Sequence, residues 1–252
     1  MSSWIIAKNK QKKKVPVITM YHDTSLSGDV FTMYLDYLSA YIYTQKLGET
    51  CNVWDSGIIK DTLKLTPQVK LLKEKPEVEP FKLEDCKAMV SKLTFKEIQK
   101  IAASLIVYDE ALNRSVIRTL EKAGIKSMFD IGIQLVSPDV NLLKRFAALI
   151  KAYQVRSKKE KLSIYVMADS YDSVVEFQKL CDPSWKVTSM SKSVPTNSDD
   201  AFVQVLAEVQ IMTALPALIL DFNKPVDRFI YLMQRNPKLD YFVELSSMDW
   251  QL

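Results

Sequence analysis

The sequence contains few of the residues that build the commonest phosphate and metal sites. Its 252 residues include five glycines, one histidine and three cysteines, whereas an average composition would give roughly 18 glycines. No two glycines have the spacing of G-x-G-x-x-G or G-x-x-x-x-G-K, so both glycine-rich phosphate loops are excluded. The single histidine, His22, excludes histidine-rich zinc sites, including H-E-x-x-H.

Cysteines and long apolar runs are equally scarce. Cys51, Cys86 and Cys181 are far apart and form no C-x-x-C pair, which argues against a structural zinc site or a disulfide scaffold and is typical of a reducing compartment. No apolar run approaches the roughly 18 residues that span a membrane. The apolar stretch 4–7 is too short for a signal peptide. We therefore expect a soluble, cytoplasmic protein.

Positive charge is concentrated at the N-terminus. The net charge is +4, and five of the first 14 residues are lysines: Lys8, Lys10, Lys12, Lys13 and Lys14. Such a cluster either tethers a chain to nucleic acid or a membrane surface or forms a solvated tail. We interpret residues 1–14 as a basic tail, because the rest of the chain is nearly neutral and offers no wide basic surface for nucleic acid.

The remaining chain alternates between strand-like and helix-like segments. An apolar run at 15–21, a helical pattern at 29–47 and a short strand at 51–54 predict a β-α-β opening with parallel strands. Residues 60–92 predict short helices and loops. Thr94 and Glu97 form a capping box at the start of a long helical pattern that ends at Gly124, which we read as two helices broken near Asn113.

The second half is more regular. Strands are predicted at 128–136, 162–168, 185–190, 217–221 and 241–245. Helices are predicted after Asp139, from a cap at Ser173-x-x-Glu176, over 199–215 and from Pro225. This alternation predicts an α/β fold with parallel sheets flanked by helices. In such sheets ligands bind beyond the carboxyl ends of the strands, where four polar loops lie: 137–139, 169–172, 191–200 and 222–225.

Several side chains in these loops are candidate ligand contacts. Helix N-termini bind anions without glycine, and Asn223, Lys224 and Arg228 at the start of the last helix predict a diphosphate site; a capped helix with a surface lysine is the alternative. Asp169 and its neighbours either contact a ribose or base or cap their helix. His22 and Asp23 either form a general-base pair or are structural.

Four segments carry a family resemblance. Residues 132–140 resemble G-V-H-V-R-R-T-D-K, 167–173 resemble a strand ending in A-T-D-D-P-S, and 222–231 resemble F-S-S-x-V-x-R-x-x-Y with Phe, Val, Arg and Tyr retained. Residues 27–30 occupy the position of a G-x-G-x-Q-like turn. The chain resembles the fucosyltransferase superfamily of α-1,6-fucosyltransferases, nodulation fucosyltransferases and protein O-fucosyltransferases, over residues 15–245.

The resemblance implies a GT-B-like glycosyltransferase of two Rossmann-like halves. Residues 15–110 would form the acceptor half and residues 111–252 the nucleotide-sugar donor half. The reaction would invert the sugar, without a metal or another cofactor. We expect Asp139 as the first candidate catalytic base, followed by Asp23 and His22. Gly28 and Asp29 would face the acceptor cleft. The expected donor-binding residues are Gly132, Gln134, Ser137, Asp169, Ser170, Asp172, Asp200, Asn223, Lys224 and Arg228.

Both arginines of the first motif are missing from residues 132–140. A leaving diphosphate needs charge stabilisation, which we assign to Lys224 beside Arg228. This difference leaves UDP-xylose beside GDP-fucose as a candidate donor, as in a viral xylosyltransferase similar to this family. A glycan hydroxyl would be the acceptor. Two alternatives are a non-catalytic nucleotide- or glycan-binding protein and an unrelated α/β protein that binds another phosphorylated ligand at the same edge.

Overall fold

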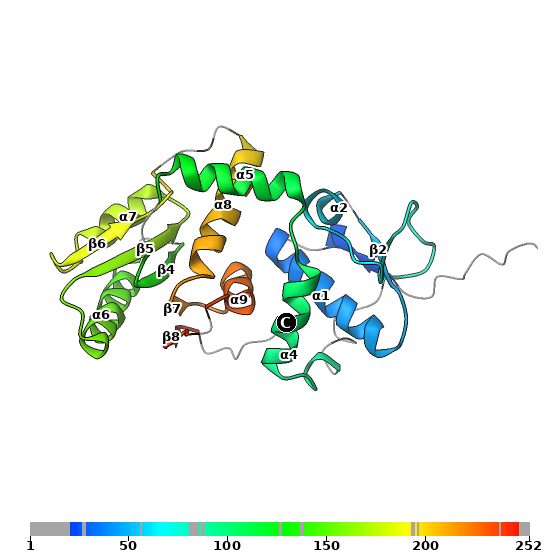
Figure 1. Cartoon of the computed structure of the whole chain (residues 1–252), viewed down its shortest axis with the longest axis horizontal. Coiled ribbons are helices and arrows are strands. Elements are labelled where there is room, and N and C mark those ends of the chain that lie inside the picture. The colour runs from blue at the N-terminus through cyan, green and yellow to red at the C-terminus, as the bar shows by residue number, and fades with distance from the viewer. Residues whose placement is uncertain are drawn as a thin grey trace, which may run out of the picture.

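The computed structural model describes residues 21–26, 29–55, 57–80, 86, 89–125, 128–136, 139–192, 195, 197–236 and 238–246. Two parallel sheets lie at opposite ends of the molecule, with helices α1, α4, α8 and α9 between them (Figure 1). The predicted α/β fold with parallel sheets flanked by helices is confirmed. Among the described helices, none has the length and apolar character needed to cross a membrane.

The smaller sheet contains β1 (His22–Asp23), β2 (Cys51–Trp54) and β3 (Val69–Leu71) in that order, all parallel. A short 3-10 turn, η1 (Thr24–Leu26), follows β1, and α1 (Val30–Lys46) connects it to β2. The helix begins where the Asp29 carboxylate accepts hydrogen bonds from the backbone N–H groups of Phe31 and Thr32, as an N-cap does. The helix and β2 were predicted; the strand expected at 15–21 lies outside the described residues except for Tyr21.

The prediction for residues 60–92 was incomplete. The structure has a short helix, α2 (Ile58–Thr62), and then strand β3, which the sequence did not reveal. Three residues are too few to show an alternating pattern, and a lysine stands in the middle of them. The strand forms because β2 offers it a pairing partner, Cys51 opposite Val69 and Val53 opposite Leu71. Tertiary pairing therefore decides the structure here.

The larger sheet has the order β6-β5-β4-β7-β8 with every neighbouring pair parallel. From the central strand β4 the chain adds β5 and β6 on one side, then crosses over and adds β7 and β8 on the other side. This is the order of a Rossmann-type sheet with its switch point between β4 and β7. All five strands were predicted: β4 (Ile131–Leu135), β5 (Leu162–Ala168), β6 (Trp185–Thr188), β7 (Ala217–Leu220) and β8 (Tyr241–Glu244).

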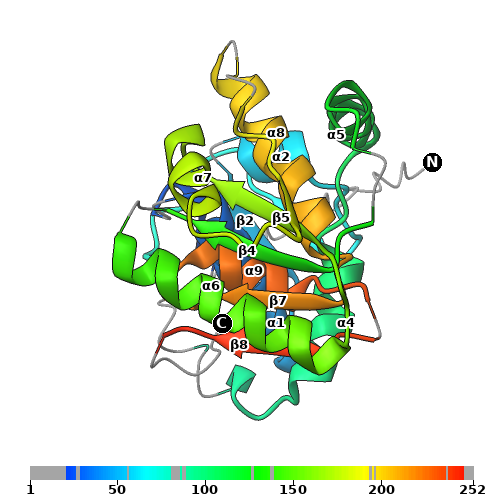
Figure 2. The ribbon, with the colours of Figure 1, turned by 90° about the vertical axis from the view of Figure 1, so that its left-hand side faces the viewer.

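Helices cover both faces of this sheet. α6 (Val140–Ser157) and α7 (Tyr171–Gln178) cover the outer face, and α8 (Ser198–Met212) and α9 (Pro225–Leu232) cover the inner face (Figure 2). Alternate residues of β4 point to the outer core, where Ile131 and Ile133 pack with Phe146. The inner core contains Leu218 and continues into the smaller sheet, so the two sheets share one hydrophobic core.

Two helix starts differ from the predictions. α4 (Phe95–Leu105) begins at the predicted capping box, but α5 (Glu110–Lys122) begins at Asp109, so the break expected near Asn113 was wrong. The Asp109 carboxylate accepts a hydrogen bond from Leu112 N at 2.7 Å, and its own N–H donates to Thr62 O at 3.1 Å. These bonds end α4 early. α7 is capped by Ser170 instead of Ser173, which lies within its first turn.

Aromatic side chains join the two halves. Phe31 of α1 lies against Phe229 of α9 with ring centroids 5.2 Å apart, and Tyr34 is 5.6 Å from the same ring. Phe95 of α4 stacks on Tyr231 of α9 at 4.6 Å. Aromatic pairs at these separations are favourable beyond their buried area. They bring the first turns of α1 next to the second turn of α9.

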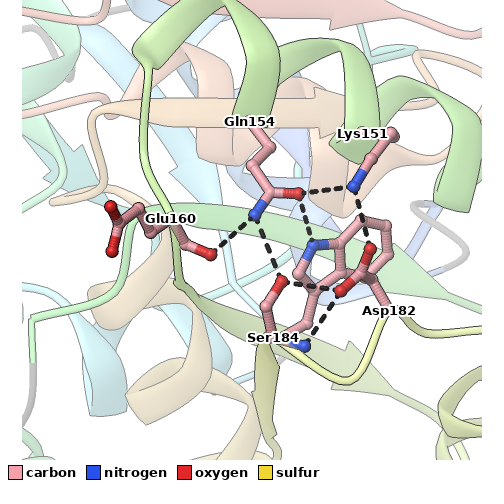
Figure 3. Close-up of polar contacts among 6 residues, drawn as sticks. Lys151, Gln154, Glu160, Asp182 and Ser184 are labelled. Atoms are coloured by element: carbon pink, nitrogen blue, oxygen red, sulfur yellow. Dashed lines mark hydrogen bonds and ion pairs between the residues drawn. The ribbon is translucent and has the colours of Figure 1, made fainter.

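A polar network ties α6 to β6 at the outer edge of the larger sheet (Figure 3). Gln154 Nε2 donates to Glu160 O and Ser184 Oγ, while its Oε1 accepts from Trp185 Nε1 at 3.0 Å and Lys151 Nζ at 3.2 Å. Every polar atom of this buried amide has a partner, as a stable buried polar group requires.

A second buried polar contact lies on the inner face. The Tyr165 hydroxyl of β5 donates to Glu208 Oε1 of α8 at 3.0 Å, and Glu208 is only 3% exposed. Burial raises the pKa of Glu208 to about 8; the negative charge of Asp169 adds to this shift, and the Tyr165 hydrogen bond opposes it. Glu208 is therefore protonated at neutral pH in the folded protein.

The raised pKa predicts pH-dependent stability. Between the usual pKa of 4.5 and about 8, the unfolded chain releases the Glu208 proton and the folded protein keeps it, so this group lowers the free energy of unfolding by up to about 1.4 kcal/mol per pH unit. Glu208→Gln keeps the hydrogen-bond acceptor for Tyr165 and does not ionise. The free energy of unfolding of this variant, measured by urea unfolding, should therefore fall less between pH 5 and 8 than that of the wild type. The exposed control Glu121→Gln should follow the wild type. Parallel pH profiles for wild type and Glu208→Gln would contradict the assignment.

Candidate nucleotide site at the switch point

The carboxyl ends of the central strands of the larger sheet lie together. Asp169, directly after β5, donates its N–H to Leu135 O at the end of β4, 3.2 Å away. β7, on the other side of β4, ends at Leu220 and is followed by Asp221. The next turn starts α9 at Lys224, with Pro225 in the first helical position as predicted. The switch point is thus bordered by three strand ends and one helix N-terminus.

Asp227 holds this corner together. Its carboxyl group is 1% exposed, and its Oδ2 accepts a hydrogen bond from Asp221 N at 2.7 Å. The Gln134 amide, oriented with its nitrogen toward Asp227, donates to Oδ1 at 2.7 Å. Burial raises the pKa of Asp227 well above its usual value; the charges of Asp221 and Glu244 add to the rise, while the hydrogen bond and Lys224 oppose it. Asp227 thereby fixes the first turn of α9 to the ends of β4 and β7.

Two cations stand on this turn. The Lys224 side chain makes no capping hydrogen bond, and its positive charge opposes the pKa rise of both Asp169 and Asp227. Arg228 is half-buried, and its Nε is shielded from solvent without a hydrogen-bond partner among the described residues. An unpaired buried donor costs about 1–3 kcal/mol. The guanidinium group therefore has unused binding capacity.

The polar residues after β5 border the same corner. Asp169, Ser170 and Asp172 are exposed. Partial burial raises the pKa of Asp169, and the positive charge of Lys224 opposes this rise. Ser170 Oγ accepts from Ser173 N at 3.3 Å as the α7 cap, and Asp172 lies in the first turn of that helix.

Two more predicted contacts lie at helix starts or turns. Asn223 is exposed, and its N–H donates to Asp221 Oδ1 at 3.1 Å. Asp200 is an exposed residue of the first turn of α8, where its N–H donates to Asn197 Oδ1 at 2.8 Å. Both side chains stay accessible to solvent.

Two predicted donor contacts lie beneath the surface. A Cβ atom on Gly132 would lie 2.6 Å from side-chain atoms of Leu215 and Met212, so this glycine allows the end of α8 to pack on β4. Gln134 is 9% exposed and is bound to Asp227. The structure therefore gives both residues a supporting position under the switch point. Ser137 lies outside the described residues.

The two candidate catalytic bases of the smaller sheet, His22 and Asp23, are both buried. His22 is 5% exposed, and burial lowers its pKa to about 4 against the opposing effect of Asp23 and Asp55. Asp23 forms an ion pair with Lys75 at 2.8 Å and accepts hydrogen bonds from the Ser25 side chain and N–H. Burial alone would raise the pKa of Asp23, but the bonds from Lys75 and Ser25 outweigh it and the pKa is lowered.

Asp139 and Asp29 are exposed helix caps. Asp139 Oδ1 accepts from Asn141 N at 2.9 Å at the start of α6, just beyond the end of β4. Asp29 caps α1, whose first turn lies beside α9 through Phe31 and Phe229. Each carboxylate caps its helix while keeping its side chain exposed. Gly28 lies outside the described residues.

Sequence reasoning missed the acids that organise the corner. Glu244, at the end of β8, accepts hydrogen bonds from Phe222 N at 3.1 Å and Ser246 N at 2.7 Å, and so fixes the turn after β7. Asp227 lies three residues beyond Lys224, a position where an acid commonly caps a helix, and this spacing was the available signal. No sequence signal pointed to Lys75, which comes from the irregular region after β3.

Comparisons with known proteins agree on the fold. No protein-family model and no curated protein sequence matches this chain. Several solved structures do: NodZ α-1,6-fucosyltransferase soaked with GDP-fucose (TM-score 0.58, 12% identity, 85% of this chain and 91% of that one), and the same enzyme co-crystallised with GDP (TM-score 0.56, 11% identity, the same coverage). The fucosyltransferase NodZ from Bradyrhizobium gives a TM-score of 0.57 at 11% identity, over 85% of this chain and 92% of that one. The fold of this chain is therefore similar to that of the NodZ fucosyltransferases.

Proposed function

We propose that this protein is a glycosyltransferase that moves a sugar from a nucleotide-sugar donor to a hydroxyl group of a glycan acceptor. The observation that carries the proposal is the pair of cations at the start of α9: Lys224 and the half-buried Arg228 stand at the switch point of a Rossmann-type sheet. This is the place where such sheets bind nucleotides. The fold is similar to that of an enzyme whose structure was solved with GDP-fucose.

The donor diphosphate would lie against the N-terminus of α9. Backbone N–H groups of the first turn, the helix dipole and two positive side chains all favour an anion there. Burial raises the pKa of Asp227 well above its usual value, which favours the neutral form of the carboxyl group in the first turn of α9. Asp169, Ser170 and Asp172 would contact the ribose or base, together with Asp200 and Asn223.

Asp139 is the best placed candidate base. It is exposed, follows the central strand β4 and uses one carboxylate oxygen as a cap, which leaves the other free to accept a proton. Asp23 is engaged by Lys75 and Ser25, and His22 is buried. We therefore rank both below Asp139, and we place them with Asp29 on the acceptor side, in the half formed by residues 15–110.

The reaction would proceed in one displacement. As the acceptor oxygen forms its bond to the anomeric carbon, Asp139 takes the hydroxyl proton and the bond from the sugar to the phosphate oxygen breaks. The electron pair stays on the diphosphate, whose growing charge Lys224 and Arg228 stabilise, as cationic clamps do in phosphate chemistry. Attack opposite the leaving group inverts the anomeric carbon. The two cations take the charge-compensating role that a metal ion has elsewhere, and GDP-fucose and UDP-xylose are the candidate donors.

A second candidate is a protein that binds nucleotide sugars or glycans without transferring the sugar. The absence of arginine from residues 132–140 favours it, because a transferase loses leaving-group stabilisation with each missing cation. Nucleotide binding without donor turnover on a broad acceptor panel would support this candidate.

The diphosphate contact predicts that Arg228→Ala weakens nucleotide binding. Removing a charge-assisted hydrogen bond costs about 1.5–3 kcal/mol, so the Kd for GDP or UDP should rise about tenfold or more in isothermal titration calorimetry. Arg118→Ala, at an exposed site on α5, is the matched control and should leave the Kd unchanged. Equal affinities for wild type and Arg228→Ala would refute the assigned role of Arg228.

The base assignment predicts a separate effect for Asp139→Asn. Asparagine caps a helix as well as aspartate does but cannot take the acceptor proton, so the fold and nucleotide Kd should persist while transfer falls about a hundredfold or more. The release of GDP or UDP from sugar donors over a glycan panel measures this. Asp109→Asn, the equivalent cap of α5, should keep full activity. If Asp139→Asn also keeps it, another residue is the base.

A further inference from the structure

A cavity lies away from the candidate nucleotide site, at the amino edge of the larger sheet. It has a volume of about 740 Å³ and is lined by α4, α5 and the C-terminal parts of α8 and α9. Its volume falls within the range of about 300–1,000 Å³ of small-molecule sites. Helices α8 and α9 run from the carboxyl edge of the sheet back to its amino edge, and the cavity begins at Phe229 on α9, beyond the first turn that contains Lys224.

The mouth of the cavity is positively charged. Lys96, Lys100 and Arg235 line it, and no aspartate or glutamate does. All three cations are exposed, and no ion pair is found for them within the described ranges. Arg235 is close enough to Tyr108 to oppose the rise that burial causes in the tyrosine pKa. The opening therefore favours a negatively charged group.

The walls are apolar and contain one unused acceptor. Ile106, Leu206, Val209 and Leu232 are lining residues. Gln210 also lines the cavity, and its Oε1 is buried with no hydrogen-bond partner in the part of the chain that the structure describes. Leaving such an oxygen unpaired is unfavourable, and a ligand N–H or O–H group would pair with it.

The negatively polarised helix end near the cavity does not cancel the positive charge of its mouth. The carbonyl groups there are already capped: Thr213 O accepts from Arg235 N at 2.7 Å, and Leu215 O accepts from Gln234 Nε2 at 3.0 Å. The negative end of α8 is thereby partly satisfied. The three cationic side chains dominate the charge at the mouth.

We propose that this cavity is a second binding site, separate from the nucleotide site, for a small amphiphilic anion. The ligand would have one acidic group at the mouth between Lys96, Lys100 and Arg235, an aromatic or acyl body against the apolar wall, and a hydrogen-bond donor facing Gln210. The cavity lies on the junction between the halves, because α4 packs on both α1 and α9.

The test uses two fluorescent dyes of the same shape. Anilinonaphthalene sulfonate carries an acidic group, an apolar body and an N–H donor, whereas phenylnaphthylamine lacks only the acidic group. At neutral pH the sulfonate dye should bind the full chain saturably at one site, and phenylnaphthylamine should bind about tenfold more weakly or worse. Neither GDP nor UDP should displace the dye.

Variants locate the dye on the protein. The double substitution Lys96→Ala with Lys100→Ala should weaken sulfonate binding about tenfold, while Lys144→Ala with Lys186→Ala, two exposed lysines elsewhere, should not. Ala103→Trp places a large ring at an exposed lining position and should block binding while the circular dichroism spectrum is preserved.

Four results would overturn the proposal: no saturable binding, equal binding of the two dyes, displacement by GDP or UDP, or full binding by Ala103→Trp. None of these results depends on whether the protein transfers sugars, so the two proposals fail independently.

Discussion

The geometry of the candidate nucleotide site depends on one buried carboxyl group. Asp227 accepts hydrogen bonds from the backbone N–H of Asp221 and from the side-chain amide nitrogen of Gln134. It thus joins the central strand, the turn after β7 and the first turn of α9 at a single point. Lys224 and Arg228 flank it on the same turn, so their positions follow from this contact. A buried carboxyl group that lost these partners would be strongly unfavourable.

The same helix also joins the two halves. α9 begins at the switch point, packs its Phe229 against Phe31 and Tyr34 of α1, and ends at the cavity beside α4. α1 in turn follows strand β1 of the smaller sheet, which consists of His22 and Asp23. The helices that follow β1 and β7 therefore meet through a packed aromatic contact. Lys224 and Arg228 therefore lie in the first turn of one of these helices, and Asp29 caps the other.

Strong local signals made most of the fold predictable. The apolar strands 131–135 and 162–168, the capping box at Thr94 and Pro225 at a helix start are all decided within a few residues. β3 and the break before α5 were not predicted, because pairing with β2 decides the first and the hydrogen bond from Asp109 N to Thr62 O helps to decide the second. In the site, the exposed loop residues could be inferred from strand order, whereas Asp227 and Glu244 act through buried contacts between segments distant in sequence.

The central claim is that a nucleotide diphosphate binds at the start of α9. Hydrogen–deuterium exchange with and without saturating GDP or UDP tests it directly, because amides held by a bound anion exchange more slowly. We expect slower exchange in peptides covering residues 221–231 and 168–173, with little change in α4 around the cavity. Slower exchange confined to α4 and the end of α8, or no change with either nucleotide, would contradict it.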